Sequence, residues 1–140
     1  MTSSGAEAYD RVVLDTSAYS HFRHGHSQIL DLLAVADIVF LPVIVRGELE
    51  AGFELGTRQK ENRATLREFL NEPSVVSAPV SESVARRYGQ VFAQLRRAGT
   101  PIPVNDIWIA ATAIVRGAHL LTFDVDFRHV AGLDFTLLQS

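Results

Sequence analysis

The chain has 140 residues, of which 47% are hydrophobic, so it is long and apolar enough to form one folded domain. It contains no cysteine, which excludes disulfides, thiolate zinc sites and a cysteine nucleophile. The formal net charge of −3 argues against a nucleic-acid partner, unless several acids form one metal site whose cation offsets their charge. No apolar run reaches the ~18 residues of a membrane span, so we expect a cytoplasmic protein without a membrane partner.

Short apolar segments alternate with longer amphipathic segments along the chain. Residues 1–10 are predicted to form a flexible lead-in, and 11–140 a single domain. The predicted strands cover 11–15, 38–41, 75–76, 119–123 and 135–138, the last of them at an edge of the sheet. The predicted helices begin at Thr16–Ser17, 29, 43, 58, Ser81 and Asn105, the named residues being the expected caps. The alternation predicts a central parallel sheet flanked by helices, an α/β/α sandwich.

Acidic residues stand where such a fold brings side chains together. Asp15 ends the first predicted strand, and Glu48 lies in the mostly apolar helix after the second strand. Asp106 stands at the start of a long apolar helix, and Asp124 follows the fourth strand. Ligands of parallel sheets bind beyond the carboxyl ends of the strands, and carboxylates that meet there repel one another unless a divalent cation lies between them. The pattern therefore predicts a Mg²⁺ or Mn²⁺ site, which would suit phosphate chemistry.

Each acid taken alone also has an ordinary structural interpretation. Asp15 could simply cap the following helix, and Asp106 could mark a helix N-terminus, where acids are common. Glu48 could be a surface charge, although Glu50 is two residues away and must point to a different side of the helix. Asp124 could belong to a turn. Only the order and spacing of the acids together favour a single site.

The order of these acids and their neighbours resemble the PIN-domain family, and most closely its VapC toxins from prokaryotic toxin–antitoxin pairs. The matching residues are Leu14-Asp15-Thr16-Ser17, Glu48-Leu49 with Gly52, Asn105-Asp106 with Ile109-Ala110-Ala111, and Thr122-Phe123-Asp124 with Asp126-Phe127. The resemblance extends over nearly the whole chain, from about Val12 to Leu138. It implies that residues 11–140 form one PIN domain.

The resemblance also implies an activity. Such a toxin is a Mg²⁺- or Mn²⁺-dependent endoribonuclease that cleaves RNA with a water activated by the metal, and tRNA and ribosomal RNA are both plausible substrates. The acids that match the family's site are Asp15, Glu48, Asp106 and Asp124, with Asp126 at a further position that is often acidic. The implied supporting residues are Thr16, Ser17, Asn105 and Thr122. The implied partners are an inhibitory VapB-type antitoxin and a second copy of the chain, as a homodimer or as a heterotetramer or hetero-octamer with the antitoxin.

Basic and aromatic residues give weaker indications of RNA binding. Lys60 is the only lysine among 13 basic residues, and the arginine fork matches phosphate oxygens, although a GC-rich genome would also explain this bias. The candidate phosphate contacts are Arg46, Arg58, Arg63, Arg86 and Arg87. For His21, His24 and His26 we expect a solvated segment rather than a zinc site, with RNA contact by one of them as an alternative. Trp108 is expected to pack within its apolar helix.

Two other functions compete with a nuclease. A regulatory module would bind RNA or a protein without cutting it, but such a module has no need of an intact acidic set. A phosphatase or receiver domain with a similar sheet would need adjacent acids after the first strand and a well-placed lysine. Asp15 has no acidic neighbour and Lys60 lies in the wrong segment, so the sequence disfavours this class.

Overall fold

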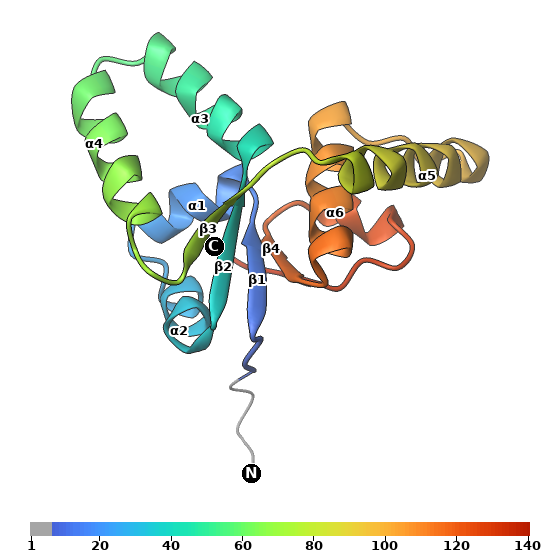
Figure 1. Cartoon of the computed structure of the whole chain (residues 1–140), viewed down its shortest axis with the longest axis horizontal. Coiled ribbons are helices and arrows are strands. Elements are labelled where there is room, and N and C mark those ends of the chain that lie inside the picture. The colour runs from blue at the N-terminus through green and yellow to red at the C-terminus, as the bar shows by residue number, and fades with distance from the viewer. Residues whose placement is uncertain (1–6) are drawn as a thin grey trace.

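The computed structural model of the chain describes residues 7–140, so the first six residues of the predicted lead-in lie outside it (Figure 1). Five parallel strands form one sheet in the order β3-β2-β1-β4-β5. The strands are β1 (Arg11–Leu14), β2 (Ile38–Pro42), β3 (Val75–Ala78), β4 (His119–Thr122) and β5 (Phe135–Leu137). The helices are α1 (Thr16–Arg23), α2 (Ser27–Val35), α3 (Val43–Leu55), α4 (Gln59–Leu70), α5 (Glu82–Ala98) and α6 (Val104–Arg116), with the 3-10 helix η1 (Val125–His129). The predicted parallel sheet and its edge strand β5 are confirmed.

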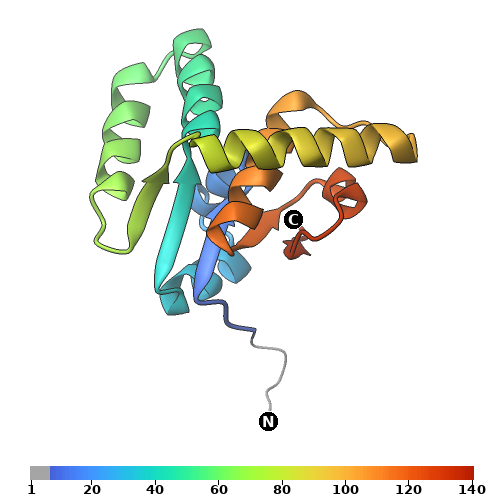
Figure 2. The same ribbon diagram turned by 45° about the vertical axis from the view of Figure 1, so that its right-hand side comes forward.

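Helices cover both faces of the sheet, as the prediction required (Figures 1 and 2). Right-handed crossovers from β1 through β2 to β3 place α1 to α4 on one face, and the return to β4 places α5 and α6 on the other. Val12, Val13 and Leu14 of β1 are therefore all fully buried, although neighbouring residues of a strand point to opposite faces. This central strand is therefore buried between the two helical layers, and the residue that follows it, Asp15, lies at the carboxyl edge of the sheet.

Several predicted helix starts were wrong by a few residues, for local physical reasons. Asp15 lies outside β1 and itself caps α1, with its carboxylate accepting from the Ala18 amide, so Thr16 and Ser17 are the first helical residues. Asn105 does not cap α6, because the extended backbone of Pro103 precedes a helix that already begins at Val104.

The second helix also begins earlier than predicted, at Ser27, because the His26 ring accepts from the Ile29 amide at its N-terminus. Its buried apolar residues are Ile29 and Leu32, while Leu30 and Val35 are exposed. The third predicted strand is longer than its two apolar residues suggested, because β3 pairs with β2 as far as Pro42 and Ala78. Tertiary pairing thus decided boundaries that the local pattern left open.

The N-terminus of α5 offers a test of local stability. The Ser81 hydroxyl accepts from the Val84 amide at 3.2 Å, as predicted for a cap. We expect Ser81→Ala to lower the free energy of unfolding by about 1 kcal/mol, measured by urea denaturation. Ser83→Ala, an exposed position in the same helical turn, is the matched control and should cause no loss, because alanine favours the helix. An equal loss in both variants would contradict the capping role.

Candidate active site

The order of the strands itself points to a ligand site. The chain proceeds from β1 to β2 and β3 on one side and returns to β4 and β5 on the other, so the order reverses between β1 and β4. Ligands of open parallel sheets bind outside the carboxyl ends of the strands at such a reversal. Asp15 directly follows β1, and Thr122 ends β4 two residues before Asp124. The fold therefore brings these residues together at the reversal point.

Asp15 is a buried carboxylate that three donors hold in place. It is only 5% exposed, and its Oδ1 accepts from the Ala18 amide at 2.8 Å and from the Ser17 hydroxyl at 2.9 Å. Its Oδ2 accepts from the hydroxyl of the fully buried Thr122 across the sheet. Burial raises the pKa of Asp15, and the three hydrogen bonds oppose that rise. The interpretation of Asp15 as a helix cap is thus confirmed, and capping does not exclude a role in a site.

Glu48, on α3, contributes a second carboxylate to the region around Asp15. Its Oε1 accepts from the Thr16 hydroxyl at 2.5 Å, and its Oε2 accepts from the Asn105 side-chain amide at 3.3 Å. Asn105, wrong as a helix cap, instead joins α3 to α6 at the site. Glu50 points away, as the spacing required, and pairs with Arg63 in solvent. Glu48 is therefore oriented by two side chains that belong to two other helices.

Asp106 is the most strongly perturbed acid of the group. Its partial burial in the first turn of α6 raises its pKa to about 7, and the charges of the neighbouring acids contribute further. These acids are Asp124, Asp15, Glu48 and Asp126, in decreasing order of effect. A carboxyl group with a pKa near neutrality, caused by burial and convergent negative charge, is typical of a functional site.

The last two acids have different positions. Asp124 lies in the wall of the hollow and caps η1 through an acceptor bond from the Asp126 amide at 2.8 Å. The Asp124 amide in turn donates to the Thr122 hydroxyl at 3.0 Å, so Thr122 bridges Asp15 and the segment that carries Asp124. Asp126 does not line the hollow, although its charge reaches Asp106. Asp124 is therefore the nearer of the two to the other acids.

These side chains surround an open hollow of about 490 Å³. Its lining consists of Asp15, Thr16, Ser17, Glu48, Asp106, Ile109, Phe123, Asp124 and Val125. Within residues 7–140 no three acidic or histidine side chains lie close enough to hold one ion as they stand. The donor set is nevertheless one of carboxylate and hydroxyl oxygens, which suits Mg²⁺ or Mn²⁺ far better than zinc. A cation would therefore need several of these carboxylates to move closer together.

The predicted phosphate contacts are scattered. Arg58, just before α4, pairs with Glu61, and Arg63 of α4 pairs with Glu50 and Glu54 of α3. The Arg46 guanidinium donates to the Ser77 hydroxyl at 3.1 Å. Arg86 and Arg87 are exposed on α5, and none of these arginines lines the hollow. The structure therefore brings the acids together but not the arginines.

Aromatic residues near the site were only partly anticipated. Trp108 stacks on Tyr88 with ring centroids 4.0 Å apart, which confirms its predicted packing role. The segment of His21, His24 and His26 was expected to be solvated. His24 is exposed, but the rings of His21 and His26 are half-buried and contact Phe123. Phe123 lines the hollow, although the sequence motif did not predict a role for it. Its place between Thr122 and Asp124, just past a strand, is the signal that could have identified it.

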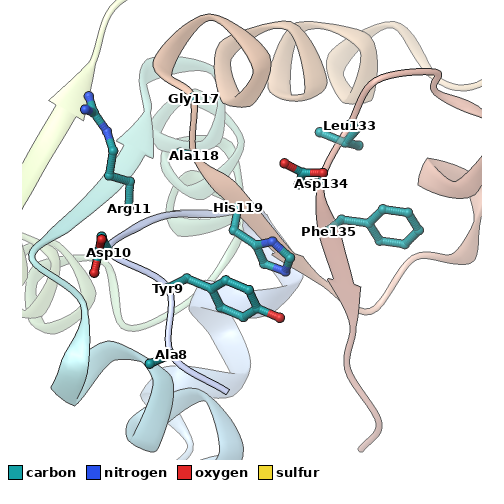
Figure 3. Close-up of a pocket in the computed structure, with 10 residues that line it drawn as sticks. All are labelled: Ala8, Tyr9, Asp10, Arg11, Gly117, Ala118, His119, Leu133, Asp134 and Phe135. Atoms are coloured by element: carbon teal, nitrogen blue, oxygen red, sulfur yellow. The ribbon is translucent and has the colours of Figure 1, made fainter.

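A second hollow, of about 670 Å³, lies at the opposite end of the strands (Figure 3). Two of its lining residues, Tyr9 and His119, have their rings stacked, with centroids 3.6 Å apart and an interplanar angle of 7°. Arg11, His119 and Phe135 begin β1, β4 and β5, so this hollow faces the amino ends of the strands. It is therefore separate from the acidic hollow, and parallel sheets seldom bind ligands at this end.

Known proteins resemble this chain over most of its length. Ribonuclease VapC5 of Mycobacterium tuberculosis is 28% identical over 86% of this chain and 87% of its own. The structure of VapBC2 from Rickettsia felis, bound to a DNA fragment from the promoter, superposes with a TM-score of 0.78 at 27% identity, covering 89% of this chain and 96% of that one. VapBC-5 of Mycobacterium tuberculosis, a member of the VapBC family of toxin–antitoxin systems, gives a TM-score of 0.71 at 26% identity over 94% and 98%. The family model for the PIN domain matches residues 12–133. The chain belongs to the PIN-domain family.

Proposed function

We propose that this protein is the toxin of a toxin–antitoxin pair and acts as a Mg²⁺- or Mn²⁺-dependent endoribonuclease. The observation that carries the proposal is the hollow at the strand-order reversal, where Asp15, Glu48, Asp106 and Asp124 converge. Relatives that are named ribonucleases, and similar structures that are toxin–antitoxin complexes, support it. Oxygen-rich carboxylate sites of this kind are suited to phosphodiester hydrolysis.

The four converging acids would hold the cation. When bound, the ion would supply an activated water and neutralise charge at the phosphate. Asp15 is held in place by Ser17, Ala18 and Thr122, so the other carboxylates would move toward it when the cation binds. The acid that the cation engages least could accept the proton of the attacking water. Asp106 is the candidate, since burial and neighbouring acids raise its pKa to about 7 in the metal-free protein.

The proposal includes partners. A VapB-type antitoxin would block the hollow, and the substrate would be a cellular RNA such as tRNA or ribosomal RNA. Exposed apolar side chains on α5 and the start of α6, such as Phe92 and Val104, support a homodimer that combines with antitoxin into a heterotetramer or hetero-octamer. No helix within residues 7–140 is long and apolar enough to cross a bilayer.

The test is cleavage of total cellular RNA by the purified chain with Mg²⁺ or Mn²⁺. Discrete fragments are expected with the metal, and excess chelator should reduce their rate of formation by at least about 100-fold, because the metal supplies both the nucleophile and charge stabilisation. Adding the metal back should restore cleavage. Absence of cleavage in every condition, together with tight RNA binding, would instead support a regulatory binding module. Cleavage that persists in chelator would contradict the metal-dependent scheme.

A further inference from the structure

Phe123 is the only aromatic residue that lines the acidic hollow within residues 7–140. It follows Thr122 at the end of β4 and precedes Asp124, so its ring stands in the same wall as the carboxylates. The His21 ring stacks on it at a centroid distance of 3.8 Å and an interplanar angle of 23°. The His26 ring meets it edge-on at 5.2 Å and 85°. Two histidines thus support the Phe123 ring, while part of it stays open to the hollow.

Backbone groups fix both supporting rings. A carbonyl oxygen can only accept, so Nδ1 of His21 donates to the Ser17 carbonyl at 2.9 Å, and Nε2 of His26 donates to the Gln139 carbonyl at 2.7 Å. The second nitrogen of His26 accepts from the Ile29 amide at 3.4 Å. Ser17 also donates to Asp15, so a single residue positions both a carboxylate and the ring behind Phe123. The support is therefore tied directly to the geometry of the acidic site.

We propose that Phe123 is a stacking platform for one unpaired nucleobase of the RNA, next to the phosphate that the acids engage, and that His21 is the positioning residue behind it. The inference rests on the proposed ribonuclease function and adds a substrate class to it. Proteins that bind RNA loops and single strands stack splayed bases on aromatic rings, whereas bases inside a duplex are not available for stacking. The platform therefore selects RNA that is unpaired at the cleavage position.

If Phe123 had only a packing role, its replacement would affect RNA binding no more than the loss of an equivalent aromatic stack elsewhere. The chain offers a matched comparison, because Tyr9 and His119 form a similar stack at the other end of β4, away from the acids (Figure 3). Loss of either aromatic ring removes a stack of about the same quality from the protein. Only Phe123, however, lines the hollow that contains Asp15, Glu48, Asp106 and Asp124. A difference in RNA binding between Phe123→Leu and Tyr9→Leu would therefore report contact with RNA rather than lost packing.

The experiment uses the full chain with Asp106→Asn, so that RNA is bound but not cut, and a short labelled single-stranded oligoribonucleotide. Phe123→Leu should weaken binding about tenfold, His21→Ala should weaken it less, and Tyr9→Leu should leave it unchanged. Phe123→Trp should keep the affinity, because its ring can still stack. In a Trp108→Phe background, the fluorescence of Phe123→Trp should be quenched by the single strand and not by a duplex of the same sequence.

Equal affinity of Phe123→Leu and Tyr9→Leu, or an unquenched Phe123→Trp, would overturn the platform. The fluorescence measurement stands even where Phe123→Leu fails to fold, because it uses an aromatic replacement. The two hypotheses fail separately. A native chain that cleaves RNA, with Phe123→Leu binding normally, would refute the platform alone. A native chain that cleaves no RNA, with quenching intact, would refute the nuclease and leave the platform as an RNA-binding site.

Discussion

Asp106→Asn should abolish RNA cleavage while the fold and the binding of RNA are retained. The amide has nearly the same shape as the carboxylate but carries no charge, so it can neither bind a divalent cation well nor accept a proton from water. Asp106 interacts electrostatically with four other acids of the site, so its loss affects the centre of the acidic group. Removing a residue that merely supports a ligand costs about 10- to 100-fold, so we expect a loss of at least about 100-fold here. Initial rates on total RNA with saturating Mn²⁺ would measure it.

A matched control keeps this result interpretable. Glu50→Gln removes an acid only two residues from Glu48, but one that pairs with Arg63 in solvent and does not line the hollow. Its cleavage rate should stay within about twofold of the native rate, because surface ion pairs contribute little. Circular dichroism and RNA binding would confirm that both variants are folded. Full activity in Asp106→Asn would rule out the proposed chemistry, whatever the control shows.

The fold could be predicted largely because its signals are local and repeated. Buried strands such as 38–41 appear in the sequence as short apolar runs. The end of a helix is also marked locally, as at Gly117, because glycine readily adopts the left-handed backbone conformation found there. The alternation of strands and helices then leaves few topologies open, because crossovers are right-handed. The ends of elements were less predictable. The start of α2 depends on a histidine cap, and the length of β3 depends on pairing with β2.

The acids of the hollow could be proposed from sequence because strand ends and helix starts meet at one edge of a parallel sheet. Contacts between segments that are distant in the sequence could not be predicted in this way. Asn105 reads as a helix cap, and only the packing of α6 against α3 turns its amide toward Glu48. His21 and Phe123 are about a hundred residues apart, and nothing local indicates that their rings stack. For the arginines, composition suggested phosphate binding, and the structure shows that two of the five, Arg58 and Arg63, pair with nearby glutamates. Phosphate contact by the arginines stays a prediction.

Without a divalent cation, the native protein should lose stability as the pH rises from about 4 to about 7. Asp106 has an ordinary pKa near 3.8 when unfolded and a pKa of about 7 when folded, so the folded state binds the proton more tightly. Such a group does not lower the free energy of unfolding below pH 4, where it is protonated in both states. Above pH 7, where it is ionised in both states, it lowers that free energy by the full amount. Burial raises the pKa of Asp15 too, so its effect has the same sign. Asp106→Asn should therefore be more stable than the native chain at pH 8 and about equal to it at pH 4.

The size of this effect follows from the burial of the group. If Asp106 were completely shielded from water, the loss of unfolding free energy would be about 4 kcal/mol. Because Asp106 is only partly buried, we expect a loss of about 1–2 kcal/mol. Urea denaturation in chelator at several pH values would measure it. Asp31→Asn, an exposed acid on α2, is the control and should leave the pH profile unchanged. Mg²⁺ should reverse the order, since it stabilises the native chain by binding its folded state and should stabilise Asp106→Asn far less. A native chain whose stability is flat between pH 4 and 8, and is unaffected by Mg²⁺, would mean that the acids neither repel one another nor bind the ion.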